Sequence, residues 1–482
     1  MRLSDFKNLA GRYYNAYWNS KDRSAKAFFL FFLDFIELMK IAGLFYGSGL
    51  LSKLKKRLLS RNPERAGTPK KRNLLILSYY SPPYRSLFGT QRLANFIKYL
   101  HRENWDITLI TTEPASEAEC DRDSDALPEG ITVIRLKPAK LKSFIENRRL
   151  AVPDDFIYWI LPAVKAVKKR IKDKSPSVLF CTAPPYSNLL AGTICSGLFD
   201  IPLVSDFRDP WSQIDFAWKL SDPILGYLSA GLEVQVLRRS AKIIIADDIR
   251  YTHDYFSKPG PPSMDKVISI RNGFDDEDFE GQKKDGSKEK FRVVYAGTLY
   301  NKTNFQNIIK PFEIWKKKHP GDFKDVLFEY AGHNPGYFNE QKNLPFEWIN
   351  HGYVSHREAI ALRFKASLQL FALDRSFKPH MLSGKIYEII RTGIPVLALV
   401  DPGGAVADLI RETGAGIVAD SEDWEGSAAL LKDFYEKWHT GNLSVKMDPE
   451  AIYKFSRAYQ ARQLSEVLDG VINGAIEREW PF

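Results

Sequence analysis

The apolar residues of the chain form short runs of strand length that alternate with stretches of helical spacing. The first series of apolar runs covers 73–80, 105–112, 131–136, 177–183, 202–207, 241–247 and 266–272. Between these runs, apolar residues recur every three or four positions at 90–102, 156–172 and 222–239. Strands that are almost continuously apolar and alternate with helices predict a parallel sheet covered by helices on both faces.

The same pattern starts again after a polar stretch at 275–290. Its apolar runs lie at 291–297, 325–332, 366–372, 394–400 and 415–420, and the stretch at 453–479 has helical spacing with no strand after it. We therefore predict an α/β protein with two doubly wound domains. The predicted segments are an extension at 1–72, domains at 73–285 and 286–454, and a C-terminal helix at 455–482.

The extension contains an apolar run at 27–51 that is long enough to span a bilayer. Asp34, Glu37 and Lys40 interrupt the run, and each charge costs about 2.5–3.5 kcal/mol at the bilayer centre. At helical spacing these three residues fall within a sector of roughly 120°, which leaves a broad apolar face. The pattern predicts a helix that lies on a surface instead of crossing a membrane.

The positive charge of the chain is concentrated in this extension. The 482 residues carry a net charge of +10, and residues 1–72 contain 16 basic and 5 acidic residues. Basic residues flank the apolar run on both sides, at 21–26 and 53–57, which is typical of an interfacial helix on an anionic membrane. We predict that residues 21–57 bind an anionic membrane surface. The alternative is a helix packed against the protein's own core.

Composition excludes several classes of protein. The nearly neutral body argues against nucleic-acid binding, since phosphate affinity requires clustered Lys and Arg on the folded surface. Three cysteines, Cys120, Cys181 and Cys195, are too few and too scattered for a disulfide framework or a zinc site. No secretory signal pattern opens the chain, so we expect a reduced, cytoplasmic compartment.

Polar residues follow the predicted strands of the first domain. Gly89 precedes a predicted helix start, where a ligand could approach the backbone amides, although such a glycine also occurs in ordinary turns. Asp206, Arg208 and Asp209 form a cluster that is too polar for a core, so we expect it to line the ligand-binding edge of the sheet. Alternatively, Asp206 or Asp209 caps the following turn. The absence of G-x-G-x-x-G and P-loop motifs argues against a nicotinamide dehydrogenase and a P-loop NTPase.

The strongest local signal is the sequence HMLSGKIYEIIRTGIPVLAL at 380–399, which is typical of a loop, a helix, a tight turn and a buried strand. Ser383, Gly384 and Lys385 fall at the helix start, where free amides, a hydroxyl and an ammonium can bind phosphate. Glu388 lies one turn further on and could accept hydrogen bonds from a ribose diol. The alternative is a surface pair of Lys385 and Glu388 worth about 0.3 kcal/mol.

A second candidate phosphate-binding turn follows the first strand of the second domain. Gly297 and Thr298 would form an amide-lined turn there, and Lys302 adds a possible charge. Because the carboxyl ends of parallel strands share one edge of a sheet, this turn and the helix start at Ser383 are expected to bind the same ligand.

Together, these motifs resemble those of the retaining glycosyltransferases of family 4, which have the GT-B fold. The resemblance covers roughly residue 73 to the C-terminus. The motifs are SYYSPPY with Gly89, DFRDPW, RNGFDDEDF, YAGTLY, SGKIYEIIRTGIPVLALVDPGG and GAGIVAD. It implies two Rossmann-like domains facing across a cleft, a nucleotide sugar held mainly by the second domain, and a final helix that crosses back to the first.

The resemblance also implies an activity. It implies sugar transfer from a nucleotide-diphosphate sugar to a glycan or lipid-linked acceptor, with retention of anomeric configuration and without a metal or other cofactor. Lys385 would stabilise the departing diphosphate and Asp209 would orient the acceptor. The implied donor-binding residues are Gly89, Gly297, Thr298, Lys302, His380, Ser383, Gly384 and Glu388. Polysaccharide biosynthesis at the inner face of the plasma membrane, with the protein bound peripherally, is the implied setting.

Two positions depart from the family pattern. His380 stands where most relatives have the first of two glutamates, and Thr298 stands where many have an arginine. His380 could contact the sugar, but a single loop histidine is more often a surface residue. These departures leave two alternatives open: a non-catalytic assembly protein at the membrane, and another reaction on the same fold, such as nucleotide-sugar epimerisation or a phosphorylase reaction.

Overall fold

The computed structural model describes residues 39–50 and 72–474, apart from 85–88, 115, 121–126, 138–151, 210, 212–222, 251–263, 285–288, 300, 334–335, 341–342 and 378. The described residues divide into two compact units. The first comprises those up to Ile249, those of His253–Ile270 and those of Ala461–Phe482, and the second comprises those of Arg250–Thr252 and Arg271–Gln460.

The first unit is built on a seven-stranded parallel sheet with the order β3-β2-β1-β4-β5-β6-β7. The strands are β1 (Asn73–Leu77), β2 (Asp106–Thr112), β3 (Thr132–Leu136), β4 (Val178–Ala183), β5 (Leu203–Phe207), β6 (Lys242–Ile245) and β7 (Val267–Ser269). Its central strands β1, β4 and β5 are almost wholly buried, as expected of strands covered on both faces.

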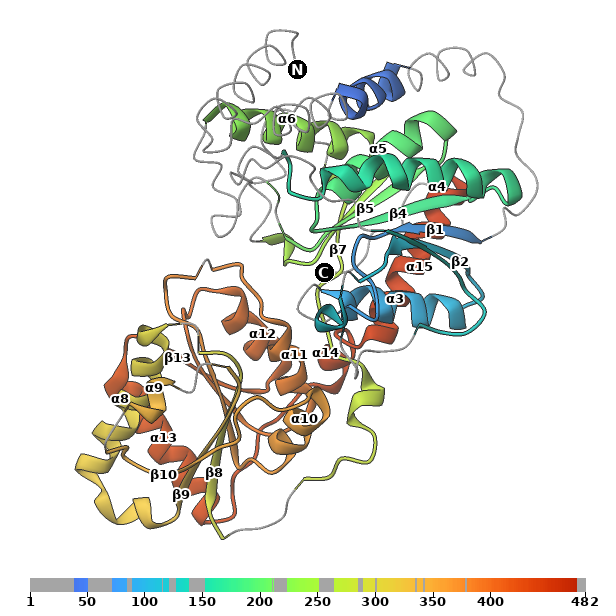
Figure 1. Cartoon of the computed structure of the whole chain (residues 1–482). Helices are drawn as coiled ribbons and strands as arrows, with labels where there is room; N and C mark the ends of the chain where they lie inside the picture. Colours follow the sequence, from blue (N-terminus) through green and yellow to red (C-terminus); the bar gives the residue numbers. More distant parts are fainter. Residues whose placement is uncertain are drawn as a thin grey trace. The chain divides into compact units, whose positions relative to one another are not determined.

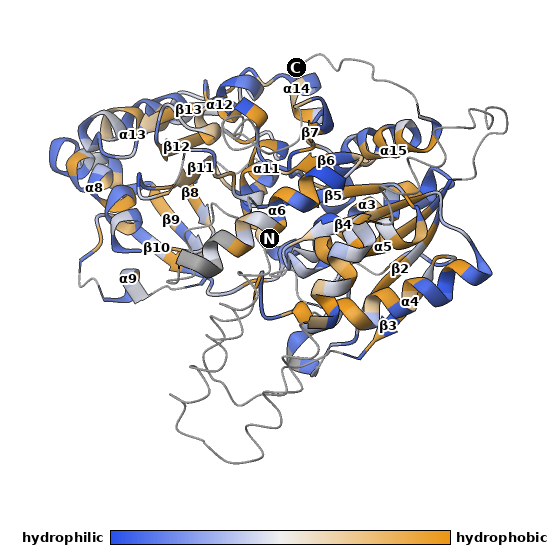
Figure 2. Ribbon diagram, turned by 90° about the horizontal axis from the view of Figure 1, so that it is seen from above, coloured by the Kyte–Doolittle hydropathy of each residue, from blue (hydrophilic) through white to orange (hydrophobic). Residues whose placement is uncertain are grey.

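Helices cover both faces of this sheet (Figure 1). One face packs against α4 (Ile160–Asp173), α5 (Ser187–Phe199) and α6 (Pro223–Arg239). The other packs against α3 (Thr90–Arg102) and the C-terminal helix α15 (Arg457–Asn473), whose Leu464 and Leu468 are completely buried. Figure 2 shows that the strands are mainly hydrophobic, whereas α3 and α4 carry polar residues as well.

The second unit contains a six-stranded parallel sheet with the order β10-β9-β8-β11-β12-β13. Its strands are β8 (Phe291–Ala296), β9 (Val326–Ala331), β10 (Glu347–Asn350), β11 (Leu368–Ala372), β12 (Val396–Val400) and β13 (Gly416–Asp420). One face packs against α8 (Lys302–Lys318) and α13 (Trp424–His439), and the other against α10 (His356–Phe364), α11 (Gly384–Arg391) and α12 (Ala405–Thr413). Two short helices, α9 (Gly336–Asn339) and α14 (Pro449–Tyr453), complete the unit.

The structure therefore shows the predicted two α/β domains with parallel sheets. It adds one strand that the apolar pattern did not indicate, β10, which lies at the edge of its sheet with three of its four residues exposed. The chain passes into the second unit after Ile270, whereas the boundary predicted from the sequence was at 285. The residues in between join the second unit because Phe274 and Phe279 are buried in its core.

The described part of the N-terminal extension packs on the first unit. Residues 39–50 are helical, and Ile41 and Phe45 are buried in the same core as α5 and α6. The guanidinium of Arg239 donates to the Phe45 carbonyl at 2.9 Å and lies 4.7 Å from the centre of the Phe45 ring. This half of the predicted 27–51 helix thus takes the alternative arrangement, against the protein's own core. The rest of that stretch lies outside the described residues.

Within the part of the chain that the structure describes, no helix combines the length and the apolar character needed to cross a membrane.

Candidate functional site

Two Tyr-Ala-Gly turns lie side by side at the carboxyl ends of β8 and β9. Tyr295 precedes Gly297 in the first turn, and Tyr330 precedes Gly332 in the second. The Tyr295 hydroxyl donates to the Thr298 carbonyl at 3.2 Å, and the Tyr330 hydroxyl donates to the carbonyl three residues further on in the same way. The two tyrosine rings stack at 6.1 Å. Each turn is therefore fixed by a buried tyrosine of its own strand.

The two turns approach each other so closely that only glycine fits at Gly332. The Gly297 amide donates to the Ala331 carbonyl at 2.8 Å, and a Cβ added at Gly332 would lie 1.9 Å from the Gly297 carbonyl oxygen. Gly332 also has a φ of +155°, which L side chains rarely adopt. The Gly297 turn is thus held by backbone on its β9 side.

Helix α11 presents an open N-terminus. Its N-cap, Ser383, makes no side-chain capping bond, and the amides of Gly384 and Lys385 donate to no acceptor among the described residues. A Cβ added at Gly384 would have no heavy atom within 4 Å. Two unsatisfied N–H groups at the positive end of a helix, with open space in front of them, form a site suited to an anion.

The side chain of Lys385 reaches from α11 to the Gly297 turn. A Cβ added at Gly297 would lie 3.6 Å from its Nζ, yet this ammonium makes no hydrogen bond or ion pair with any residue that the structure describes. Burial lowers the pKa of Lys385, the positive charge of Arg363 lowers it further, and Glu388 opposes both effects. The structure thus brings together Gly297, Lys385 and the amides after Ser383, which the sequence analysis had assigned to one ligand.

Glu388 lies beside two basic side chains of α10. Its Oε2 is 3.9 Å from Nη2 of Arg363, and its Oε1 is 3.9 Å from Nε2 of His356, which is also 3.3 Å from Asp278. Arg363 also donates to the Ala296 carbonyl at 3.0 Å. Arg363 was not predicted from the sequence, because nothing in the spacing of α10 distinguishes it from a solvent-exposed arginine.

Of the remaining residues predicted in the second unit, Thr298 belongs to the Gly297 turn, whereas Lys302 and His380 lie on other segments. Thr298 continues the Gly297 turn and is partly exposed, and its amide donates to no acceptor among the described residues. Lys302 is exposed at the first position of α8, just after the N-cap Asn301. His380 is half-buried in the turn that precedes α11. The compact group is therefore Gly297, Thr298, Ser383, Gly384, Lys385 and Glu388.

An aromatic pair that the sequence analysis missed lies at the same edge of the second sheet. The rings of His333 and Tyr353 are 4.5 Å apart, and Tyr353 is 72% exposed. The Gly332 amide donates to the Gly352 carbonyl at 2.7 Å, which joins the loops that carry the two rings. This pair offers an exposed aromatic surface close in sequence to the Gly332 turn.

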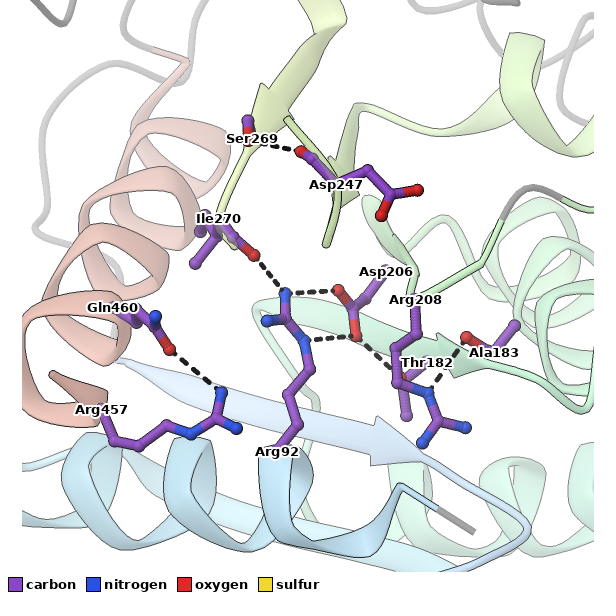
Figure 3. Close-up of polar contacts among 10 residues, drawn as sticks. All are labelled: Arg92, Thr182, Ala183, Asp206, Arg208, Asp247, Ser269, Ile270, Arg457 and Gln460. Atoms are coloured by element: carbon purple, nitrogen blue, oxygen red, sulfur yellow. Dashed lines mark hydrogen bonds and ion pairs between the residues drawn. The ribbon is translucent and has the colours of Figure 1, made fainter. Parts of the chain in front are cut away.

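In the first unit, the expectation that Asp206 lines an open edge is wrong. Asp206 is completely buried within β5 and forms an ion pair with Arg92 of α3, with Nη2 3.0 Å from Oδ1 (Figure 3). The Thr182 hydroxyl donates to its Oδ2 at 2.7 Å, and Arg92 also donates to the Ile270 carbonyl at 2.8 Å. A charged residue is stable in this core because both of its oxygens are paired.

Gly89 makes room for an arginine side chain. It is the N-cap of α3 with a φ of +71°, and a Cβ added there would lie 1.6 Å from Nη1 of Arg208. Arg208 donates through Nε to the Ala183 carbonyl at 3.1 Å and also to the Pro184 carbonyl. The observed reason for glycine at this position is therefore the close approach of Arg208.

Asp209 and Asp247 also lie at the carboxyl edge of the first sheet. Asp209 is exposed after β5, and its backbone carbonyl accepts a bond from the Tyr186 hydroxyl at 3.4 Å. Asp247 follows β6, and its carboxyl group points away from the pair of Arg92 and Asp206 (Figure 3). Burial, reinforced by the charge of Asp209, raises the pKa of Asp247 to about 7. Within the described residues, no group of three His, Cys, Asp or Glu side chains is placed to hold a metal ion.

No protein-family model matches this chain, and no curated protein matches it. Solved structures are similar in fold. An α,α-trehalose-phosphate synthase (UDP-forming) from Burkholderia vietnamiensis matches with a TM-score of 0.52 and 11% identity over 85% of this chain and 99% of that chain. The α,α-trehalose 6-phosphate synthase from Burkholderia multivorans matches with a TM-score of 0.51 and 10% identity over 84% and 98% of the two chains.

A UDP-N-acetylglucosamine 2-epimerase matches with a TM-score of 0.50 and 13% identity over 86% of this chain and all of that chain. These nucleotide-sugar glycosyltransferases and epimerases share the GT-B fold, and at such low identities the likeness shows the fold alone. The chain therefore has the GT-B fold.

Proposed function

We propose that this protein is a glycosyltransferase that takes a sugar from a nucleotide-diphosphate sugar, and that the second unit binds the donor. The observation that carries the proposal is the Lys385 ammonium, which lies beside the Gly297 turn at the open N-terminus of α11 and forms no ion pair with any of the described residues. A partly buried cation without a partner is unfavourable unless an anion joins it. A diphosphate supplies that anion.

The same groups suit the chemistry of transfer. Cleavage of the bond between the sugar and the diphosphate develops negative charge on the leaving group. Donors fixed before the reaction stabilise this charge, and the loss of one such donor typically lowers the rate by about 10²–10³. Lys385 and the amides of Gly384 and Thr298 are donors of this kind, because the helix and the tyrosine-held turn fix their positions.

The rest of the nucleotide has two candidate contacts. Glu388 lies one turn after Lys385 on the same face of α11, where its carboxylate would accept hydrogen bonds from ribose hydroxyls. The exposed Tyr353 with its partner His333 would stack on the base. Stacking tolerates every base, so this surface supports nucleotide binding without selecting the nucleotide.

The finer assignments rest on the resemblance to retaining glycosyltransferases of family 4. We propose retention of anomeric configuration, activity without a metal, and binding of a glycan or lipid-linked acceptor by the first unit, with Asp209 and Asp247 as its candidate carboxyl groups. NMR of the product fixes the configuration of the new bond. Full activity after EDTA treatment is expected, and loss of activity that Mg²⁺ restores would contradict the metal-free assignment.

Binding of UDP, GDP and dTDP, measured by thermal shift and calorimetry, tests the donor site. We expect one of them to bind the wild type and Lys385→Met to weaken that binding at least tenfold, which corresponds to about 1.4 kcal/mol. Lys365→Met is the matched control, since Lys365 is an exposed lysine just after α10. Turnover of the matching nucleotide sugar without an acceptor to an epimer would identify an epimerase instead. Binding of none of the three would favour a non-catalytic protein.

We also propose that the basic extension associates with an anionic membrane from the cytoplasmic side. The basic residues around 21–26 and 53–57 support this, as do Met39 and Leu50, which are exposed apolar residues of the described helix. Because Ile41 and Phe45 belong to the core, charge reversal at Lys53, Lys55, Lys56 and Arg57 is a cleaner test than truncation. The reversed variant should no longer float with phosphatidylglycerol vesicles, and unchanged flotation would contradict the assignment.

A further inference from the structure

Arg363 is a buried cation whose hydrogen-bonding capacity is largely unused. The residue is 1% exposed, and its Nε and Nη1 atoms have no hydrogen-bond partner among the described residues. Burial lowers the pKa of its guanidinium, and the nearby carboxylate of Glu388 opposes this effect. Taking a guanidinium out of water without satisfying its donors is destabilising. The burial of these two nitrogens is therefore not offset by hydrogen bonds to the described residues.

Among the described residues, Nη2 of Arg363 contacts both β8 and α11, the two elements that carry the candidate donor site. Its Nη2 donates to the Ala296 carbonyl at 3.0 Å, and this carbonyl ends β8 immediately before Gly297. The same atom is 3.9 Å from Oε2 of Glu388 on α11. A single rigid guanidinium thus lies between the strand that carries the turn and the helix that carries Lys385.

Arg363 also supplies a positive charge close to the Gly297 turn. Position 298 is a threonine, so the Gly297 turn has no basic side chain of its own at that point. The charge of Arg363 lowers the pKa of Lys385, after the larger effect of burial. Among the described residues, the titratable and charged groups around these side chains are His356 of α10, Glu388 of α11, Tyr295 of β8 and Asp278 of η6 (Asp276–Phe279).

We propose that Arg363 is a positioning residue of the donor site, which fixes the Gly297 turn and Glu388 relative to each other and keeps the site positively charged for a diphosphate. The inference rests on the proposed function, since it takes the diphosphate as the ligand. Arg363 is too deeply buried to touch that ligand, so it acts through the Ala296 carbonyl, Glu388 and its field at Lys385. It supplies from α10 a fixed positive charge that position 298 does not provide.

The variants Arg363→Met and Arg363→Lys test this role in the full-length protein, with Arg357→Met as the matched control, because Arg357 is exposed on the same helix. Binding of inorganic pyrophosphate and of UDP, GDP and dTDP is measured by calorimetry. The titration of Lys385 is measured without any ligand, from the pH dependence of its labelling by acetic anhydride followed by mass spectrometry. The melting temperature of each variant is recorded in parallel.

We expect Arg363→Met to melt at the wild-type temperature or above it. The substitution removes two buried nitrogens that have no hydrogen-bond partner among the described residues, and the carboxylate it leaves, Glu388, is 19% exposed. The affinity of this variant for pyrophosphate and for the bound nucleotide should fall about tenfold or more, in the range of a hydrogen bond to a charged group. Lys385 should become labelled only at higher pH, since a neighbouring positive charge is gone. Arg363→Lys should recover part of both effects, and Arg357→Met should show neither.

Three results would count against the inference. Wild-type affinity and an unchanged Lys385 titration in Arg363→Met would overturn it and leave the donor site intact. A loss of affinity that only parallels a loss of melting temperature would make Arg363 a structural residue. If the wild type binds neither pyrophosphate nor any of the three nucleotides, the assignment of the donor site is wrong, and so is the proposed role of Arg363.

Discussion

Alanine at Gly332 should destabilise the protein, whereas alanine at Gly297 should leave stability unchanged and weaken nucleotide binding, although the two glycines follow neighbouring strands in the same Tyr-Ala-Gly sequence. At Gly332 the new Cβ would lie 1.9 Å from the Gly297 carbonyl oxygen and 2.7 Å from its carbon. Both atoms are backbone, so no side chain can rotate away. The two turns must separate by about 1.5 Å to reach ordinary contact.

That separation disturbs hydrogen bonds whose free-energy contribution is known in magnitude. It strains or breaks the bond from the Gly297 amide to the Ala331 carbonyl and the bond from the Gly332 amide to the Gly352 carbonyl. Overpacking costs about 1–3 kcal/mol and each lost hydrogen bond about 1 kcal/mol, so Gly332→Ala should destabilise the second unit by about 3–5 kcal/mol. At Gly297, by contrast, the nearest atoms to a new Cβ are at 3.6 Å, and we expect a change within about 0.5 kcal/mol.

Urea unfolding combined with hydrogen exchange and mass spectrometry separates these effects. Gly332→Ala should lower the unfolding midpoint and speed exchange in peptides that cover β8 and β9. Gly297→Ala should leave both unchanged but weaken nucleotide binding, because its methyl group would occupy space beside Lys385 Nζ. Equal stability of Gly332→Ala and the wild type would refute the close packing of the two turns. Equal nucleotide affinity of Gly297→Ala would refute the placement of the ligand over Gly297.

Three further substitutions test the first unit. Arg92→Met should cost about 3–5 kcal/mol, because it leaves the buried Asp206 unpaired, and urea unfolding measures the loss. The pKa of Asp247 is raised from its usual 3.8 to about 7, so the stability it contributes is present below pH 4 and is lost as the pH rises through 7. Asp247→Asn should remove this decline from the pH profile of unfolding, and an unchanged profile would contradict it. Phe45→Ala should cost about 3–5 kcal/mol and release Arg239, whereas a neutral result would show that the N-terminal helix contributes nothing to the core.

The strands could be predicted where they are buried on both faces, because such strands appear in the sequence as nearly continuous apolar runs. Both sheets consist mainly of apolar runs, and each strand ends where its run ends. The loops that follow the strands were therefore predictable, and with them the position of Gly297 and of the start of α11 at the carboxyl edge of the second sheet. Strand β10 escaped because an edge strand exposes most of its residues and its Glu and Asn positions are typical of a loop.

The polar interior could not be derived from local spacing. The partner of Asp206 is Arg92, which lies 114 positions away in the sequence, and no local pattern links the two. Arg363 is similar, because its position in a helix does not indicate that it reaches β8 and α11. A signal did exist for Gly332, since the sequence Tyr-Ala-Gly occurs at both 295–297 and 330–332. That repetition would have indicated two matching turns on adjacent strands.

The most direct test of the donor site is hydrogen exchange of the full-length protein with and without the nucleoside diphosphate that binds it best. The proposed site predicts slower exchange at 297–299 and 383–387. There the amides of Thr298, Gly384 and Lys385, which donate to none of the described residues, would donate to phosphate. The control is the peptide that covers α13. This helix lies on the face of the second sheet opposite to α11, and its exchange should be unaffected. Protection confined to other segments, or protection that persists in Lys385→Met, would contradict the assignment of the diphosphate to Lys385 and the Gly297 turn.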